Sequence, residues 1–450
     1  MGFEFRPKRF FLSVEEYAMN KHPGEASDGS TRFLYVVSEG FPPTVFDSQV
    51  LDYLHLMEGD GIRFDLIVFE RLLGLFPNWH RNLLRLREVR SQLKGQVYFR
   101  SLITTFLEWD LWVPQLQLYS IAKPSGQTAR TVVHARTQTA AAIALGLKNW
   151  LQNTKVIFDM RGDTPAEFLL SLEKSGRDPG SPAARRKYTK LKGIERQAVM
   201  GSDAILCVSG AMKEKIIGEY RVSPQKIQVV PTVASTQKFY WDAKLRTRVR
   251  KELGIEDKFA LIYAGSIRAY QTLEALLEFY RKLRENRQHL HLLLITPQNA
   301  EAKLLLKKTL QSGTYTVQSA GHDEMVGWLN AADAGLLLRE TNAVNQVAAP
   351  TKFAEYLLCG LPVVISQGIG DFSDLARNQN VGIVLQGCQR EEELHDRWIE
   401  LQTLANPVSR DHIAQVGKQL FSNEHFARLL ASLYLKLSQE NDQAMPRKHE

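Results

Sequence analysis

The chain has 450 residues, of which 44% are hydrophobic and 24% are charged, and its formal net charge is +8. This length is too great for one ordinary hydrophobic core, so we expect two or three domains of a soluble globular protein. No run of about 18 apolar residues occurs, which excludes a membrane-spanning helix, and the N-terminus lacks the apolar segment of a secretory signal. Three widely separated cysteines argue against a disulfide framework or a structural zinc site, and a cytoplasmic location fits best.

The excess of positive charge favours anionic partners and leaves two interpretations open. One is a solvated basic surface, and the other is contact with phosphates or with an anionic membrane. Residues 1–30 are predicted to form a flexible extension, and their segment "RPKRFF" could contact anionic lipid peripherally at the inner face of the membrane. The basic residues are dispersed and no nucleic-acid-binding motif occurs, so no nucleic acid partner is expected.

Short apolar strands alternate with amphipathic helices through the N-terminal half. Continuous apolar strands joined by helices predict a parallel sheet covered on both faces, in which ligands bind at the carboxyl ends of the strands. The expected strands lie in the segments 32–40, 62–70, 131–137, 155–162 and 203–210. The candidate ligand contacts at their carboxyl ends include Gly40, His134, Arg136, Asp159, Arg161 and Ser209.

The alternation stops near residues 232–240, where a proline and small polar residues predict a linker, and then restarts. A helix at 271–283 carries its apolar residues on one face, as expected of a helix that packs on a sheet. The sequence therefore predicts a second doubly wound α/β domain. Its expected strands lie in the segments 259–267, 289–297, 315–321, 334–340 and 361–366.

The segment "APTKFAEYLLCGLPVV" places charges of both signs at the start of an otherwise apolar helix. Pro350 and Thr351 predict a helix start with Thr351 as the N-cap, so that Lys352 lies in the first turn, where a cation opposes the helix dipole. This placement makes sense if Lys352 and free backbone N–H groups hold a phosphate, while Glu355 accepts hydrogen bonds from a ribose diol. The alternative is a surface pair of Lys352 and Glu355 worth about 0.2–0.5 kcal/mol, and these residues alone leave both interpretations open.

Polar residues stand in two further strand-to-helix connections. The first connection can bind phosphate, although the same pattern occurs in plain turns. The second is long for an α/β unit, and long loops at strand carboxyl ends usually carry function. The candidates are Gly265, Ser266 and Arg268 in the first connection, and Arg339, Glu340 and Asn345 in the second.

Four motifs in this half, "AGSIRAYQTLEALLEF", "GWLNAADAGLLLRE", "PTKFAEYLLCGLPVV" and "GIGD", occur in order at sensible spacings. They resemble the C-terminal domain of family-4 retaining glycosyltransferases of GT-B fold. In the first half, "IERQAVMGSDAILCVSGAMKEKI" and "VVPTVAS" are similar to the end of that family's N-terminal domain. The resemblance covers residues 32–435, and "PTKFAEYL" followed by "GLPVV" is its most specific part.

The resemblance implies two Rossmann-like doubly wound domains that face a cleft. An acceptor domain is expected at 31–235, completed by a C-terminal helix at 416–440 that crosses back to it, and a donor domain at 236–415. The implied activity is transfer of a hexosyl-type sugar from a nucleotide-sugar to a glycan or lipid-linked acceptor with retention, in polysaccharide biosynthesis. Cationic groups and N–H donors would stabilise the departing phosphate, and no metal or other cofactor is expected.

The resemblance also implies roles for individual residues. In the family, the helix that matches Thr351 to Leu358 holds the donor nucleotide, with Glu355 on the ribose, and Thr351 and Lys352 lie near the diphosphate. The implied donor-binding residues are Gly265, Ser266, Arg268, Arg339, Asn345, Thr351, Lys352 and Glu355. The acceptor-side residues are Gly40, Asp159, Arg161 and Ser209, and the catalytic candidates are His134, Arg136 and Glu340.

The sequence departs from the family pattern at several positions. Gln271 and Thr272 stand where the family often has glycine and lysine, and Val347 stands where many members have a second glutamate. Glu340 or Asn345 would then substitute for that glutamate. These departures leave a non-catalytic or accessory GT-B protein open as the alternative function, with a sugar-nucleotide epimerase as a third interpretation.

Structural interpretations stay open for the charged residues of the first half as well. His134 could be a hydrogen-bonded structural histidine, and both His134 and Arg136 are candidates for the position of the family's N-domain histidine. Asp159 and Arg161 could be an ion pair that holds a loop rather than acceptor contacts.

Overall fold

The computed structural model describes residues 31–41, 45–102, 111–123, 130–267, 273–321, 323–386 and 391–439, and of residues 72–79 and 391–392 it describes the backbone alone. The extension predicted at 1–30 and the candidate Arg268 therefore lie outside the described residues. Contacts divide the chain into two compact units. The first unit comprises Met1–Arg161, Lys192–Val229 and Phe426–Glu450, and the second comprises Gly162–Leu191 and Val230–His425.

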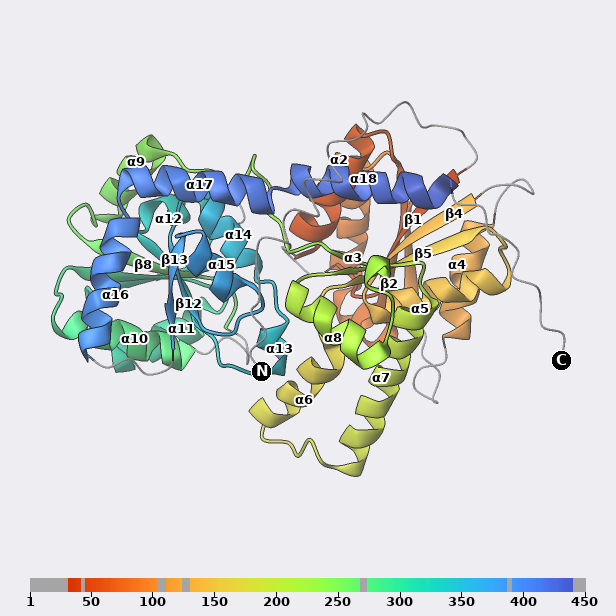
Figure 1. The fold of residues 1–450 in the computed structure, drawn as a ribbon, viewed down its shortest axis with the longest axis horizontal. Coiled ribbons are helices and arrows are strands. Elements are labelled where there is room, and N and C mark those ends of the chain that lie inside the picture. Colours follow the sequence, from red (N-terminus) through yellow and green to blue (C-terminus); the bar gives the residue numbers. More distant parts are fainter. Residues whose placement is uncertain are drawn as a thin grey trace. The chain divides into compact units, whose positions relative to one another are not determined.

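The first unit is built on a parallel sheet whose described strands follow the order β3-β2-β1-β4-β5-β6-β7 (Figure 1). The strand order reverses direction between β1 and β4. In a doubly wound sheet the connections leave such a point toward opposite faces, and ligands bind there. Val37 of β1 lies opposite Arg136 of β4, and Arg136 lies opposite Asp159 of β5. The strands are β1 (Thr31–Val37), β2 (Phe64–Arg71), β3 (Val97–Leu102), β4 (Arg130–Arg136), β5 (Thr154–Met160), β6 (Ala204–Cys207) and β7 (Ile227–Val229).

Helices connect these strands and cover the sheet (Figure 1). In the first connection, Val50, Leu54 and Met57 recur at helical spacing and are buried along one face of η1 and α2. The terminal helix α18 also packs on this unit, where the Tyr434 hydroxyl lies 2.5 Å from the Tyr53 hydroxyl. The elements are η1 (Asp47–Leu51), α2 (Asp52–Gly59), α3 (Leu72–Gln92), α4 (Trp112–Ala122), α5 (Gln138–Leu145), η2 (Gly146–Asn149), α7 (Pro182–Gly201, shared with the second unit), α8 (Gly210–Tyr220), η3 (Pro224–Lys226) and α18 (Asn423–Gln439).

The second unit is built on another parallel sheet, with described strands in the order β10-β9-β8-β11-β12-β13. Its strands are β8 (Phe259–Ala264), β9 (Leu290–Ile295), β10 (Tyr315–Gln318), β11 (Ala334–Leu337), β12 (Val363–Ser366) and β13 (Gly382–Leu385). Its other helices are α6 (Thr164–Lys174), α9 (Ala243–Leu253), α10 (Leu273–Glu285), α11 (Asn299–Thr309), α12 (Met325–Ala331), α13 (Ala343–Gln346), α14 (Thr351–Leu358), α15 (Phe372–Asn378), α16 (Glu391–Leu404) and α17 (Pro407–Phe421).

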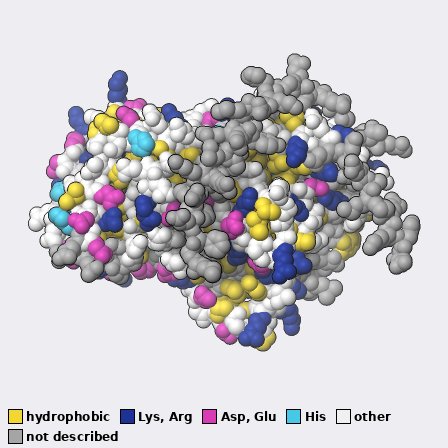
Figure 2. Space-filling view, viewed as in Figure 1, with side chains coloured by type: hydrophobic (Ala, Val, Ile, Leu, Met, Phe, Trp, Pro, Cys, Tyr) yellow, Lys and Arg dark blue, Asp and Glu magenta, His cyan; other side chains and the backbone are white. Residues whose placement is uncertain are grey.

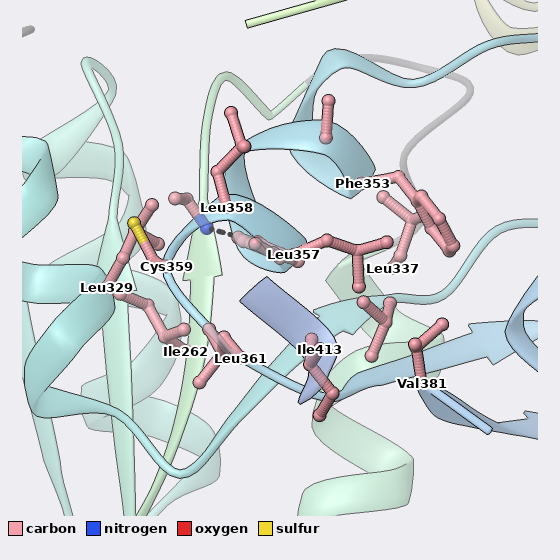
Figure 3. Packing of buried hydrophobic residues seen from close by; sticks show 14 of the residues in the cluster. Ile262, Leu329, Leu337, Phe353, Leu357, Leu358, Cys359, Leu361, Val381 and Ile413 are labelled. Atoms are coloured by element: carbon pink, nitrogen blue, oxygen red, sulfur yellow. Dashed lines mark hydrogen bonds between the residues drawn. The ribbon is translucent and has the colours of Figure 1, made fainter. Parts of the chain in front are cut away.

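The helix α14 is held in a hydrophobic core. Phe353, Leu357 and Leu358 are fully buried and pack among side chains of the sheet and of α17, as Figure 3 shows. At Gly417 of α17 a Cβ would lie 2.8 Å from the backbone of Leu357, so this glycine lets the two helices approach closely. Burial of several large side chains, each worth about 1.5–3 kcal/mol, fixes the start of α14 against the sheet.

The predicted fold is confirmed: two parallel, doubly wound Rossmann-like sheets. Three strands were missed for identifiable reasons. The edge strand β3 is partly exposed along most of its length, β7 has only three residues and ends just before the segment predicted as a linker, and β13 has four residues. Short or half-exposed strands bury too few apolar residues to give a continuous hydrophobic run.

The described part of the chain contains no helix that is long and apolar enough to cross a bilayer. Lys and Arg side chains are dispersed over the face shown in Figure 2 and alternate there with Asp and Glu.

Candidate functional site

The start of α14 meets the carboxyl end of β8 at Gly265. The Lys352 side chain crosses this glycine, where a Cβ would lie 2.3 Å from the Lys352 Cε, and Gly265 has a φ of +140°. The Lys352 Nζ lies 4.0 Å from the centroid of the Tyr263 ring. A side chain at 265 would therefore displace the ammonium group from this cation–π contact.

The helix α14 begins one residue earlier than the sequence predicted. Pro350 is its N-cap residue, with φ −68° and ψ 122°, and no side chain caps the helix. Thr351 is therefore the first helical residue, so the prediction that it is the N-cap is wrong. Proline is compatible with this position because its fixed φ suits a helix start. Its missing N–H costs nothing there, since the residue that begins a helix donates no hydrogen bond within the helix. No side chain caps the first turn, in which the Phe353 N–H donates to the Pro350 carbonyl at 3.0 Å, and the positive end of the helix dipole there favours an anion.

Glu355 lies one turn beyond Lys352 and is partly buried. Burial raises its pKa from 4.5 to about 7, while the positive charge of Lys352 acts in the opposite direction. Burial of Glu355 therefore outweighs the charge of Lys352, which supports a ligand-binding carboxyl group over a solvated surface pair. We call Gly265, Lys352 and Glu355 the α14 site.

The long connection between β11 and α14 is organised by Asn345, which is fully buried. Its side chain accepts a hydrogen bond from the Arg339 guanidinium at 3.1 Å and donates one to the Glu340 carbonyl at 2.9 Å. The Glu340 carboxylate lies 2.7 Å from the Lys174 ammonium group of α6. Asn345 is thus placed to fix the loop that carries Arg339 and Glu340.

The donor candidate Ser266 lies in a different connection, the turn after β8. Its backbone carbonyl accepts a hydrogen bond from the Tyr263 hydroxyl at 2.7 Å.

Four charged or titratable side chains of the first unit converge at the ends of β4 and β5. The Asp159 carboxylate lies 3.3 Å from His134 Nε2, 3.5 Å from the Arg136 guanidinium and 3.5 Å from that of Arg161. Burial by itself would raise the pKa of Asp159, but the charges of Arg161, His134 and Arg136 outweigh it and hold that pKa well below its usual range. We call these four residues the first-unit charge cluster.

His134 lies inside the first unit and is 2% exposed. Its Nδ1 lies 2.6 Å from the Tyr434 hydroxyl of α18, and its ring stacks on Tyr35 at 4.3 Å. Burial lowers the pKa of His134, although the neighbouring Asp159 opposes this shift. These contacts support the structural interpretation of His134, since its Nδ1 contacts Tyr434 and its Nε2 lies 3.3 Å from Asp159. Arg136 is likewise buried, at 5% exposure.

One residue that the sequence analysis missed, Thr137, stands at the same edge of the sheet. Thr137 follows β4 and has φ +80° and ψ 158°, a region that is accessible essentially to glycine alone. Its hydroxyl lies 2.7 Å from the Ser38 hydroxyl at the end of β1, and its N–H donates to the Asp159 carbonyl at 3.0 Å. No sequence signal marks this conformation, because it is imposed by the contacts of three strands that are distant in sequence.

The remaining acceptor-side candidates have local structural roles. Ser209 is buried and caps α8, since its hydroxyl accepts from the Met212 N–H at 3.1 Å. Gly40 has φ +68°, and a Cβ there would lie 1.6 Å from a carboxylate oxygen of Glu70. Glu70, which the sequence analysis missed, thus lies against Gly40 at the end of β2, and burial raises its pKa.

The structure therefore brings the predicted residues together in two separate groups. Lys352, Glu355 and Gly265 form the group at the start of α14. His134, Arg136, Asp159 and Arg161 form the group in the first unit. Tyr263 also belongs to the first group and was missed, although its position two residues before Gly265 at the end of an apolar strand could have identified it.

Both halves of the chain match families of known proteins. Residues 246–419 match the family described as "Glycosyl transferases group 1", and residues 62–238 match "Glycosyltransferase Family 4". The chain finds no match among curated protein sequences.

Among solved structures, the chain is similar to HepE from Anabaena in complex with UDP, with a TM-score of 0.62, 11% identity and coverage of 90% of this chain and 100% of that one. Sucrose-phosphate synthase from Thermosynechococcus elongatus gives a TM-score of 0.64 at 14% identity, covering 90% and 99%. WaaG, a glycosyltransferase involved in lipopolysaccharide biosynthesis, gives 0.58 at 13% identity, covering 89% and 99%.

The two family matches and the paired Rossmann-like sheets define the class of this protein. It is a glycosyltransferase of GT-B type. One family match falls on each half of the chain, and the match to the second half includes the whole of the α14 site.

Proposed function

We propose that this protein transfers a sugar from a nucleotide-sugar donor to a glycan or lipid-linked acceptor with retention, in the biosynthesis of a bacterial surface polysaccharide. The observation that carries the proposal is the α14 site. There an ammonium group, uncapped helix N–H groups and a carboxyl group of raised pKa lie within one helical turn at the carboxyl end of β8.

Each group of the α14 site suits one part of a nucleoside diphosphate. Lys352 and the first-turn N–H groups suit the diphosphate, because both are donors to anionic oxygens. Glu355 suits the ribose diol, since its carboxyl group can accept hydrogen bonds from vicinal hydroxyl groups. As the bond to the sugar breaks, negative charge grows on the diphosphate, and Lys352 stabilises that charge where it develops.

The remaining donor-side candidates are proposed to act around this centre. Arg339 is held by Asn345 and adds a second cation to the donor side. Glu340 is the catalytic candidate for contact with the sugar, in place of the glutamate that would stand at Val347. Arg268 and Ser266 follow the strand that ends at Gly265 and are proposed phosphate ligands.

The acceptor is proposed to bind at the strand ends of the first unit, near Gly40, Arg136, Asp159 and Arg161. Arg161 is more exposed than Asp159, with side-chain exposures of 15% and 5%. Arg161 is thus the member of this pair best placed to meet a hydroxyl or phosphate group of an acceptor.

Transfer is tested by incubating the protein with a panel of nucleotide-sugars, with and without glycan and lipid extracts, and measuring release of nucleoside diphosphate. We expect release from one donor, dependent on acceptor and unaffected by a metal chelator, and a product whose anomeric configuration by NMR matches that of the donor. A donor that is consumed with inversion would contradict the retaining mechanism.

A second candidate function is a protein that binds nucleotide or glycan without turnover. It is favoured by Val347, a buried valine at the position of the second glutamate, and by the engagement of Glu340 with Lys174. Binding of a nucleoside diphosphate without release from any donor and acceptor pair would support this candidate. Absence of both binding and release would refute the donor site itself.

A further inference from the structure

Helix α7 has an excess of positive charge. Its sequence contains six basic residues and a single acidic one, Glu195. Glu195 is buried, where it contacts the Tyr220 hydroxyl and lies 2.6 Å from the Lys192 ammonium group. The carboxylate of this helix is therefore compensated inside the protein and does not face outward. The basic residues are Arg185, Arg186, Lys187, Lys190, Lys192 and Arg196.

The helical spacing of α7 separates a buried side from a basic side. Ala184, Leu191, Ile194 and Ala198 recur at intervals of three, four and seven residues and are buried along one side of the helix. The opposite side is exposed to solvent, and we call it the α7 face. Its residues are Arg185, Arg186, Thr189, Gly193 and Arg196.

The basic side chains of the α7 face stand on both sides of a low strip. Arg185 and Arg196 lie about three turns apart in one row, and Arg186 lies about 100° further round the helix. Thr189 and Gly193 lie between these positions. A Cβ at Gly193 would meet no atom within 4 Å, so packing does not require a glycine here, although glycine weakens a helix. The small residues therefore leave room for a ligand between the guanidinium groups.

Other exposed helices of the chain pair their basic side chains with carboxylates of the same helix. Within the part of the chain that the structure describes, no carboxylate pairs with Arg185, Arg186 or Arg196. The α7 face is thus a surface whose charge the described residues leave uncompensated. The pairs in other helices include Arg248 with Glu252 in α9, Lys282 with Glu278 in α10 and Arg397 with Glu400 in α16.

The acidic residues closest to α7 in the sequence have other contacts. Asp178, before the helix, accepts a hydrogen bond from the Gly180 N–H at 2.8 Å, and Asp203, after it, lies 2.7 Å from the Lys148 ammonium group. The neighbouring helix α6 (Figure 1) contacts another side of α7, where the Phe168 ring lies 4.6 Å from the Lys187 ammonium group.

We propose that the α7 face binds an acidic glycan, a sugar chain that carries carboxylate or phosphate groups on its repeat units. Guanidinium groups bind both kinds of anion through two parallel hydrogen bonds. From Arg185 to Arg196 the helix rises about 16 Å, so an extended chain laid along it meets more than one cation. The inference rests on the proposed function, because it names an acidic polymer as the acceptor class and α7 as its anchor.

An acidic polymer suits the α7 face better than a membrane or a nucleic acid does. No large hydrophobic side chain is exposed between residues 182 and 199, whereas a helix that lies in a membrane interface buries such side chains in lipid. Proteins that bind single-stranded nucleic acid stack the bases on aromatic rings, and the α7 face contains no aromatic residue.

The test is binding of labelled polysaccharides to the full-length protein, measured by fluorescence anisotropy without any sugar donor. Polygalacturonate supplies carboxylates, phosphomannan supplies phosphates, and dextran is the neutral polymer. We expect an acidic polymer to bind with an affinity that falls as salt is added, and dextran not to bind.

The variant combines Arg185→Gln, Arg186→Gln and Arg196→Gln. The matched control removes the same charge from exposed positions of α9, α10 and α18. We expect the variant to lose affinity for the acidic polymer on the order of tenfold or more, and the control to retain it. The control substitutions are Arg248→Gln, Arg281→Gln and Arg428→Gln.

An unchanged circular dichroism spectrum and thermal midpoint establish that the variant is folded. Equal affinities of the variant and the control, or no binding of either acidic polymer, would overturn the inference. Tighter binding of single-stranded DNA or of phosphatidylglycerol vesicles than of both acidic polymers would overturn it as well. Because no donor is present, failure of this binding leaves the proposed sugar transfer intact, and failure of nucleoside diphosphate release leaves the polymer binding intact.

Discussion

The first-unit charge cluster and the α14 site both place opposite charges at the carboxyl edge of a parallel sheet, but they compensate these charges differently. In the cluster, Asp159 lies within 3.5 Å of two guanidinium groups and an imidazole, and its pKa is lowered. In the α14 site, burial outweighs the nearby ammonium group, and the pKa of Glu355 is raised to about 7.

The opposite pKa shifts of Asp159 and Glu355 indicate two different roles. The charges around Asp159 stabilise the fold, whereas the charges at the start of α14 suit a ligand. A buried carboxylate whose pKa is lowered has its compensation inside the fold. A carboxyl group whose pKa is raised is under-compensated, and such groups are enriched at functional sites. The following predictions test this contrast, from the largest expected effect to the smallest.

The largest loss of stability is expected for Asp159→Asn. The change leaves the Arg136 and Arg161 guanidinium groups in a buried place without their carboxylate, and breaking a buried ion pair in this way costs about 3–5 kcal/mol. Urea unfolding should show this decrease, and affinity for the proposed nucleoside diphosphate should stay the same because the proposed donor residues lie in the second unit. Asp257→Asn, at an exposed carboxylate, is the matched control. A variant as stable as the control would show that the cluster does not stabilise the fold.

Lys352→Ala should lower the affinity for ligand more than it lowers the free energy of unfolding, which is the reverse of the effect expected for Asp159→Asn. Losing a hydrogen bond to a charged group costs about 1.5–3 kcal/mol, which corresponds to a decrease of about 10- to 150-fold in affinity for the proposed nucleoside diphosphate. The free energy of unfolding should change by less, since the cation–π contact with Tyr263 is worth about 0.5–1 kcal/mol. Calorimetric titration measures the affinity, with Lys303→Ala on the exposed side of α11 as control. Equal affinities for the two variants would remove Lys352 from the donor site.

The raised pKa of Glu355 predicts a pH dependence of stability. Between pH 4.5 and about 7 the folded state retains a proton that the unfolded state releases, so the free energy of unfolding should fall as the pH rises through this window. The decrease should be at most about 3 kcal/mol, because one pKa unit corresponds to about 1.4 kcal/mol. Glu355→Gln should lack this component, whereas Glu301→Gln on α11 should retain it. Identical pH profiles for wild type and Glu355→Gln would contradict the raised pKa.

The smallest effect is expected at Thr137, where the first unit holds backbone strain. Thr137→Gly removes a strain of about 1–3 kcal/mol and loses the hydroxyl contact with Ser38, which is worth about 1 kcal/mol, so the variant should be at least as stable as wild type. Thr137→Val keeps the strain and loses the contact, and should be less stable by about 1 kcal/mol. If the glycine variant is the less stable of the two by thermal unfolding, the strain is not stored at this position.

Much of the fold could be predicted from the sequence because long apolar strands and amphipathic helices have recognisable periodicity. The helix over 273–283 is an example, since Leu273, Leu276, Tyr280 and Leu283 are all buried as its spacing required. Short strands such as β7 and β13 were missed because three or four residues carry too little periodicity. The N-cap at Thr351 was misplaced because proline occupies the cap position itself.

The candidate site was predicted in part. The charges at Lys352 and Glu355 are visible in the sequence, because a cation in the first turn of an apolar helix has no local reason to be there. The approach of Lys352 to Gly265 and Tyr263 joins segments that are almost ninety residues apart, and no local pattern specifies it.

The sequence by itself thus determined the alternation of strands and helices, the two doubly wound sheets and the presence of two opposite charges at the start of α14. Only the tertiary structure decided how each charge is compensated. Partial burial raises the pKa of Glu355, whereas the pairing of β4 with β5 sets Asp159 beside Arg136. The physical reason is that electrostatic energies depend on distance and solvent exposure in three dimensions, which packing fixes and sequence order does not.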